Sequence, residues 1–166
     1  MKQGIVIAGF AGIGKTTLAK KYRNVIDLES SNYRWDNSKI MDIPVEQRKG
    51  TTRNSNPNWP LNYINAIEEA IEKYDIVLVW IKPEVLEIYE KNNIPYVLCY
   101  PSKKALPEYE QRFIKRGNNK EYIRRVIDTY DERFEQFENY QADKIVLEEN
   151  ETLEDYLVKN NYPLEK

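Results

Sequence analysis

The feature that constrains this chain most is a glycine-rich turn between a short apolar segment and a helical pattern. Residues 9–16 read Gly-Phe-Ala-Gly-Ile-Gly-Lys-Thr and match the pattern G-x-x-x-x-G-K-[ST]. Residues 5–8 are continuously apolar and predict a buried strand, and residues 15–22 predict a short helix. Three of the six glycines stand in this turn, so a strand–loop–helix unit is the first element that the sequence predicts.

The residue types in this turn favour phosphate binding. Glycines let the backbone curl so that successive amide N–H groups face one concavity, where they bind phosphate oxygens. In this pattern Lys15 reaches the terminal phosphates of a nucleotide, and the hydroxyl of Thr16 is placed to bind magnesium. The predicted ATP-binding residues are Gly9, Gly12, Ile13, Gly14, Lys15, Thr16 and Thr17. The alternative is a glycine-rich turn with a chance Lys-Thr pair.

Composition excludes several kinds of chemistry. The chain has no histidine, so Ser-His-Asp catalysis, Cys-His catalysis and histidine-bound zinc are ruled out. Its single cysteine, Cys99, cannot form an intrachain disulfide, and its place within an apolar stretch predicts a buried small side chain. Catalysis would have to use carboxylates, Lys, Arg, hydroxyl groups and a hard metal such as magnesium.

Charge and hydropathy indicate the kind of partner. The net charge of −2 argues against general nucleic-acid binding. Residues 103–125 nevertheless hold eight basic and three acidic side chains, a net charge of +5 that leaves −7 for the rest. This local excess favours a small anionic ligand. No apolar run could span a membrane and the start of the chain has no secretory pattern, so we expect a cytoplasmic protein with no membrane partner.

The hydrophobic pattern predicts alternating strands and helices. Solid apolar runs predict buried strands over 5–8, 24–28, 75–81, 94–100 and 144–147. Helices are expected over 15–22, over 61–73 with Leu61, Ile64, Ile67 and Ile71 on one face, over 83–91, around Leu106–Tyr109–Phe113, as one longer helix through 123–137, and over 152–159. This order is typical of an α/β fold whose parallel sheet has helices on both faces. Residues 30–60 are expected to be mostly loop, with one helical turn near 45–48, and 1–166 is expected to be a single domain.

Other motifs narrow the class of phosphate-loop protein. The acidic D-x-x-G switch and the N-K-x-D motif of signalling GTPases are absent from the sequence. The apolar stretch 76–81 ends in Lys82, where motor and transporter ATPases usually carry an aspartate. The size and the element order instead resemble the nucleoside-monophosphate-kinase-like group of phosphotransferases, which includes adenylate, shikimate and gluconate kinases. The resemblance implies a three-layer fold with a five-stranded parallel sheet in the order 2-3-1-4-5.

The resemblance also implies roles for two acids after the loop. Residues 25–29 read Val-Ile-Asp-Leu-Glu and look like the second strand of shikimate-type kinases, which ends in D-x-D. Asp27 would then be the acid on the magnesium side, and Glu29 the acid on the acceptor side. The carboxyl ends of strands in open α/β sheets face the ligand crevice, which agrees with these roles. The alternative is a pair of solvated acids at the end of a strand.

Two further segments are similar to parts of these kinases. The basic segment 103–125 looks like their lid, in which Arg112 and Arg116 share a helix face and would clamp the transferred phosphoryl group. The segment 30–60 lies where they bind the acceptor. There Arg53, with Arg34 and Arg48, is a candidate phosphate ligand. The aromatic side chains that could stack on a base or a sugar are Trp35, Trp59 and Tyr63. The alternatives are a solvated basic helix and a surface loop with aromatic anchors.

Two classes of function remain open at this stage. The first is a phosphotransferase that moves the γ-phosphoryl group of Mg-ATP to a nucleoside, a nucleotide or another small acceptor with a hydroxyl group. Such catalysis depends mostly on positioning and charge stabilisation, so it needs no histidine. The second is an ATP-binding module without transfer chemistry. The sequence also looks like small phage P-loop proteins treated as nucleotide kinases.

Overall fold

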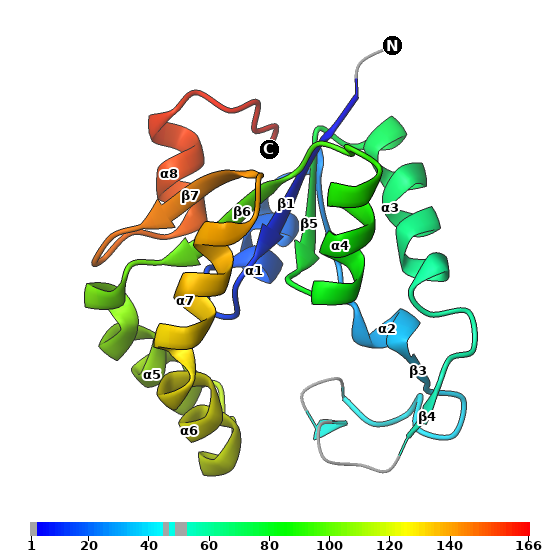
Figure 1. The fold of residues 1–166 in the computed structure, drawn as a ribbon, viewed down its shortest axis with the longest axis horizontal. Helices are drawn as coiled ribbons and strands as arrows, with labels where there is room; N and C mark the ends of the chain where they lie inside the picture. The colour runs from blue at the N-terminus through cyan, green and yellow to red at the C-terminus, as the bar shows by residue number, and fades with distance from the viewer. Residues whose placement is uncertain (1–2, 45–46, 49–52) are drawn as a thin grey trace.

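The computed structural model describes residues 3–44, 47–48 and 53–166 and has an α/β architecture. A sheet of five parallel strands is flanked by helices on both faces (Figure 1). Its strands are β1 (Ile5–Gly9), β2 (Val25–Leu28), β5 (Ile76–Trp80), β6 (Val97–Pro101) and β7 (Asp143–Leu147). The helices around it are α1 (Lys15–Lys21), α3 (Leu61–Lys73), α4 (Pro83–Lys91), α7 (Tyr130–Asn139) and α8 (Leu153–Lys159).

The sheet has the strand order β2-β5-β1-β6-β7. When these five strands are numbered one to five along the chain, their order in the sheet is 2-3-1-4-5. This is the same order as the one that the resemblance implies. β1 lies in the centre, with Gly9 opposite Trp80 of β5 and opposite Cys99 of β6. The central strands are continuously apolar because both of their faces are covered, and Ile7, Leu78 and Leu98 have no exposed surface. The glycine-rich loop therefore leaves from the middle of the sheet.

The two faces of the sheet carry different helices. α1 and α8 lie on one face, where Tyr22 donates a hydrogen bond to Glu154 at 2.7 Å and Lys21 forms an ion pair with the same carboxylate. α3, α4 and α7 lie on the other face (Figure 1). Cys99 is fully buried in β6, as the sequence predicts. Within the described residues, no helix combines the length and the apolar character needed to cross a membrane.

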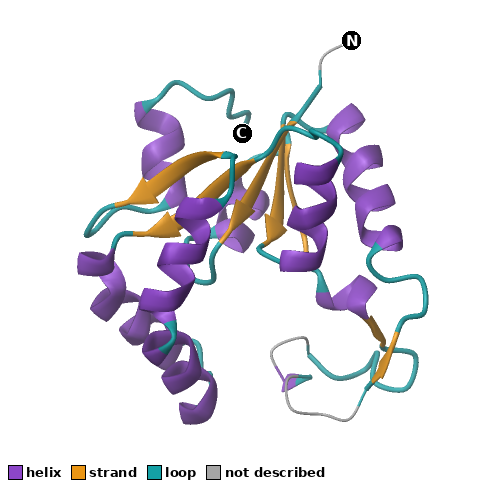
Figure 2. Ribbon diagram, viewed as in Figure 1, coloured by secondary structure: helices purple, strands orange, loops and turns teal. Residues whose placement is uncertain are grey.

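Two extensions continue beyond the carboxyl ends of the strands. One holds the short helical turn η2 (Lys103–Ala105), α5 (Leu106–Lys115) and α6 (Lys120–Asp128). The other, which we call the arm, is the described part of residues 30–60. It contains α2 (Ser31–Arg34) and a small antiparallel pair formed by β3 (Trp35–Asp36) and β4 (Asn54–Ser55). Figure 2 shows that most of the arm is loop and that the two extensions lie on opposite sides of the molecule.

The structure corrects two sequence predictions. The helix expected through 123–137 is interrupted at Thr129, whose hydroxyl donates to the carbonyl of Arg125 at 2.6 Å and ends α6. On α3, Leu61 is 62% exposed at the first position, and Tyr63 is buried in its place. The described part of the segment 30–60 is mostly loop, as expected, and it also contains α2 and the β3–β4 pair. Of the turn expected near 45–48, residues 45–46 lie outside the described residues.

Candidate functional site

Contacts from several elements hold the glycine-rich loop in place. The side chain of Phe10 is buried, with its ring 5.2 Å from that of Tyr130 on α7 and 6.4 Å from that of Trp80 on β5. The amide of Phe10 donates to the carbonyl of Cys99 at 2.9 Å, and the buried Ile13 accepts a hydrogen bond from the amide of Leu153 at 3.1 Å. The loop is thus fixed from the sheet, from α7 and from the start of α8.

Glycine is required at the centre of the loop for two reasons. Gly12 has a φ of +81°, in the left-handed region that favours glycine. A Cβ atom there would lie 3.1 Å from Cδ1 of Tyr109 and 3.3 Å from Cε1 of Phe113, both on α5. Gly14 has a φ of +96° and precedes α1, and no side chain caps the first turn of that helix. The backbone conformation and the packing of α5 therefore both depend on the glycines of the pattern.

Lys15 folds back onto its own loop. Its Nζ donates to the carbonyls of Gly9 and Phe10 at 2.9 and 3.0 Å and lies 4.8 Å from the centre of the Trp80 ring. The side chain is partly buried. Burial lowers the pKa of Lys15 to about 8. The negative charge of Asp27 acts in the other direction and raises this pKa, but its effect is smaller. The ammonium group therefore lies at the loop, bonded to carbonyls that a phosphate could replace.

Thr16 and Asp27 meet directly. The hydroxyl of Thr16 donates to Oδ2 of Asp27 at 2.9 Å, between the first turn of α1 and the neighbouring strand β2. Burial raises the pKa of Asp27, while Lys15 and the hydrogen bond from Thr16 oppose this increase. Hydroxyl and carboxylate oxygens are hard ligands of the kind that magnesium prefers, and magnesium needs only one or two carboxylates when phosphates and waters complete its shell. These two residues therefore fit a magnesium ion.

Glu29 lies at the same end of β2. With Thr16 and Asp27 it lines a cavity of about 530 Å³. Its carboxylate is exposed and accepts a hydrogen bond from the amide of Ser31 at 3.2 Å. Thr17, in the first turn of α1, is also exposed. Among the described residues, no group of three or more Cys, Asp or Glu side chains forms a cluster of metal ligands.

The two predicted lid arginines have different surroundings. Nη1 of Arg112 donates to the carbonyl of Gly12 at 2.7 Å, while its Nη2 lies 3.7 Å from the carboxylate of Glu108. Arg112 is thus held against the loop. Arg116 follows α5 and is exposed, and its positive charge makes a minor contribution to the electrostatics at Lys15 and Asp27. Arg124 and Arg125 are exposed on α6.

The arm places arginines around one indole. The guanidinium carbons of Arg34 and Arg53 lie 4.9 and 5.0 Å from the centre of the Trp35 ring. In the part of the chain that the structure describes, neither guanidinium lies within ion-pair distance of a carboxylate. The third candidate, Arg48, is buried and donates to the carbonyls of Ile43 and Met41. Arg48 therefore stabilises the arm. Arg34 and Arg53 are the arginines of the arm whose positive charges could bind an anionic ligand.

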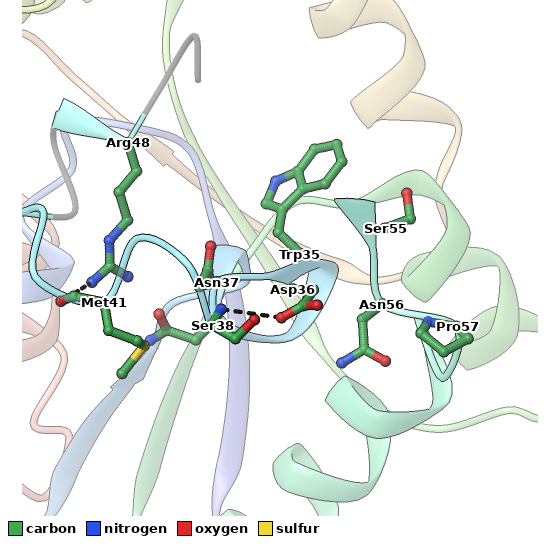
Figure 3. A pocket seen from close by; sticks show the side chains of 10 residues that line it. Trp35, Asp36, Asn37, Ser38, Met41, Arg48, Ser55, Asn56 and Pro57 are labelled. Carbon is green, nitrogen blue, oxygen red and sulfur yellow. Dashed lines mark hydrogen bonds between the residues drawn. The ribbon is translucent and has the colours of Figure 1, made fainter. Parts of the chain in front are cut away.

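Two of the aromatic side chains predicted to stack on a ligand have structural roles. Tyr63 has no exposed surface and donates to the carbonyl of Leu28 at 2.7 Å. Trp59 stacks on Tyr63 with ring centres 5.5 Å apart, and its Nε1 donates to Glu84 of α4 at 3.1 Å. They fasten the arm to α3 and α4. Trp35 lines a cavity in the arm (Figure 3).

Two cationic side chains, Lys82 and Arg133, were not identified as candidate site residues from the sequence. Lys82 follows β5, and its Nζ lies 5.8 Å from the centre of the Trp80 ring that Lys15 also approaches. Burial lowers the pKa of Lys82, and the charges of Arg34 and Arg133 contribute to the shift in the same direction. The signal for Lys82 was its position at the carboxyl end of a central strand. Arg133 lies in α7. The apolar residues of this helix predicted that it packs on the sheet, and they gave no sign of a functional arginine.

Comparisons with known proteins do not assign this chain to a family. No protein-family model matches the chain, and a search of curated proteins gives no match.

The shifted pKa of Lys15 predicts a pH dependence for nucleotide binding. A lysine with a lowered pKa is neutral above that value, and bound phosphates would raise the pKa again. We therefore expect ATP binding above about pH 8 to take up a proton, and affinity to fall by up to about tenfold per pH unit from there. Titration calorimetry in two buffers with different ionisation heats measures the uptake. An affinity that stays constant between about pH 7 and 9, without proton uptake, would contradict this expectation.

Proposed function

We propose that this chain is an ATP-dependent phosphotransferase of the nucleoside-monophosphate-kinase-like group. The observation that carries the proposal is that Lys15, Thr16 and Asp27 lie together at the carboxyl end of the sheet, where the Thr16 hydroxyl is bonded to Asp27 and the charge of Lys15 acts on the same carboxylate. The 2-3-1-4-5 order of the sheet supports the assignment to a three-layer P-loop fold. The two extensions beyond the same end of the sheet carry arginines that are exposed or partly exposed, Arg116 in one and Arg34 and Arg53 in the other, and these support transfer to a second substrate.

Each part of the site has a role in this reaction. The loop amides from Gly12 to Thr16 would hold the β- and γ-phosphates of ATP, and the ammonium of Lys15 would leave the carbonyls of Gly9 and Phe10 to bind them. Thr16 and Asp27 would hold magnesium, which neutralises charge on these phosphates when bound. The carbonyl of Gly12 already orients Arg112 beside the loop.

The transfer itself needs little covalent chemistry from the protein. An oxygen of the acceptor attacks the γ-phosphorus while the bond to the β–γ bridging oxygen breaks, and ADP leaves. A hydroxyl acceptor would pass its proton to Glu29, the exposed carboxylate beside Asp27, whereas an ionised phosphate would need no base. Arg112 and Arg116 would stabilise the charge on the transferred group. Lys82, Arg34 and Arg53 make an anionic acceptor the best match.

A transfer assay tests this proposal. The chain is incubated with magnesium and γ-labelled ATP, together with nucleosides, nucleoside monophosphates, phosphorylated sugars and neutral sugars. We expect ADP and a labelled acceptor to appear in equal amounts with at least one of these compounds. Binding of ATP with no loss of label would instead indicate an ATP-binding module, and release of inorganic phosphate alone would indicate hydrolysis. Either result contradicts the proposal.

The lid role predicts a local change in hydrogen exchange. α5 is packed on the loop through Tyr109 and Phe113, so we expect residues 116–128 to respond to ligands more than α5 does. Exposed basic side chains in this stretch repel one another until phosphates bind, and closure excludes water from the phosphoryl group. Backbone exchange over 116–128 should slow when ATP and an accepted substrate are both added. Exchange that no ligand changes would mark α6 as a plain basic surface helix.

A further inference from the structure

The hydroxyl of Tyr63 lies between two strands, at the end of the sheet where the candidate site is. It donates to the carbonyl of Leu28, the last residue of β2, at 2.7 Å. It also accepts a hydrogen bond from the amide of Trp80, the last residue of β5, at 3.4 Å. The side chain of Tyr63 has no exposed surface. One buried hydroxyl therefore links the ends of two neighbouring strands.

The carbonyl of Leu28 controls how Glu29 leaves the strand. This carbonyl belongs to the same peptide unit as the nitrogen of Glu29, and peptide units are planar. A hydrogen bond that fixes the carbonyl therefore also fixes the direction of the chain at Glu29. The exposed carboxylate of Glu29 then accepts the hydrogen bond from the amide of Ser31 at 3.2 Å. The backbone and the side chain of Glu29 are thus held from two different sides.

Aromatic packing from the arm holds the ring of Tyr63 in place. Trp59 stacks on it with ring centres 5.5 Å apart and an angle of 21° between the planes. Tyr33 lies with its ring centre 5.2 Å away, at an angle of 44°. Because Tyr63 is buried, its hydroxyl cannot touch a substrate. Any effect of this hydroxyl on a reaction must therefore pass through the backbone that it holds.

We propose that Tyr63 is a positioning residue that sets the direction of the Glu29 carboxylate through the peptide unit between Leu28 and Glu29. Without the hydroxyl, the Leu28 carbonyl and the Trp80 amide lose a buried partner, and the end of β2 can shift. A shift of about 1 Å in a group that acts on a substrate can reduce a rate by up to about a hundredfold. The role of Glu29 in transfer rests on the proposed function, whereas its position can be measured on the protein alone.

Tyr63→Phe tests the position of Glu29 without an assay of activity. The substitution removes the hydroxyl and keeps the ring that packs on the arm. NMR hydrogen exchange of the full chain then measures the amide of Ser31, whose acceptor is the Glu29 carboxylate, and the amide of Trp80, whose acceptor was the hydroxyl. We expect both amides to exchange about fivefold or more faster, the scale of one lost hydrogen bond. Unchanged exchange at the two amides would overturn the proposal.

Tyr96→Phe is the matched control. Tyr96 is also buried, and its hydroxyl donates to Glu90 at 2.9 Å. It precedes β6, so it lies at the opposite end of the parallel sheet from the candidate site. This variant should lower the thermal midpoint by an amount similar to that of Tyr63→Phe and leave the exchange of the Ser31 amide unchanged. Faster exchange at Ser31 in both variants would indicate a general loosening of the fold and would overturn the proposal.

Transfer kinetics test whether this position matters to the reaction. With an accepted substrate, Tyr63→Phe should lower kcat/KM for the acceptor about tenfold and leave the dissociation constant of ATP within about twofold of the wild-type value. In a Glu29→Gln background the loss should disappear, because no carboxylate is left to position.

The outcomes separate this proposal from the proposed function. Normal transfer in Tyr63→Phe, or a loss that persists in full beside Glu29→Gln, would overturn the positioning role while the phosphotransferase stands. A wild-type chain that transfers no phosphate would reject the phosphotransferase. In that case the exchange of the Ser31 amide would still decide whether Tyr63 positions Glu29.

Discussion

Lys15→Ala is expected to reduce ATP binding or turnover by about a hundredfold or more, the scale of losing one group that stabilises developing charge. In the structure its ammonium lies beside the loop and is bonded only to the carbonyls of Gly9 and Phe10 among hydrogen-bond acceptors of the described residues. Its burial disfavours the charged form, so the fold gains little from it. We therefore expect the thermal midpoint of the variant to stay near that of the wild type.

Calorimetry with ATP and a coupled assay for ADP measure the two effects of this change. Lys73→Ala, which removes an exposed lysine at the end of α3, is the matched control and should bind and turn over ATP normally. If Lys15→Ala retains wild-type affinity and wild-type turnover, the loop is a structural turn.

Asp27→Asn is expected to reduce phosphoryl transfer by about a hundredfold or more, because it removes the carboxylate next to the metal-binding hydroxyl. β5 ends in Trp80 and is followed by Ile81 and Lys82, so the neighbouring strand supplies no acid in its place. The amide keeps the size of the side chain and still accepts the hydrogen bond from Thr16. ATP binding should change little, while the magnesium concentration needed for half-maximal transfer should rise.

Glu29→Gln is the informative comparison for this change. If Glu29 acts on the acceptor, the variant should raise the KM for the acceptor or lower the rate with hydroxyl acceptors, with the magnesium requirement unchanged. A wild-type transfer rate in Asp27→Asn would mean that another acid holds the metal and that the shikimate-type analogy is wrong for β2.

The sequence predicted the sheet better than it predicted the site. Buried strands such as 76–81 are solid apolar runs, so the hydrophobic pattern alone located them. The site depends on contacts between segments far apart in the chain, such as the packing of Tyr109 and Phe113 on Gly12 and the bond from Arg112 to its carbonyl. Local spacing showed that Arg112 and Arg116 share a helix face but not that Arg112 touches the loop.

The arm shows where residue type was a poor guide. Arg34, Arg48 and Arg53 looked equivalent in the sequence, yet backbone carbonyls surround the buried Arg48. Tyr63 looked like a stacking platform, but its position in the first turn of α3 turns it into the core.

The most direct measurement of the central claim is a crystal structure of the chain with magnesium and a nonhydrolysable ATP analogue. The account predicts that the β-phosphate lies against the amides of residues 12–16, with Nζ of Lys15 moved from the carbonyls of Gly9 and Phe10 to the phosphates. It also predicts magnesium within bonding distance of the Thr16 hydroxyl, with Asp27 bound to it directly or through water. A nucleotide bound elsewhere, with Lys15 still bonded to the two carbonyls, would contradict the account.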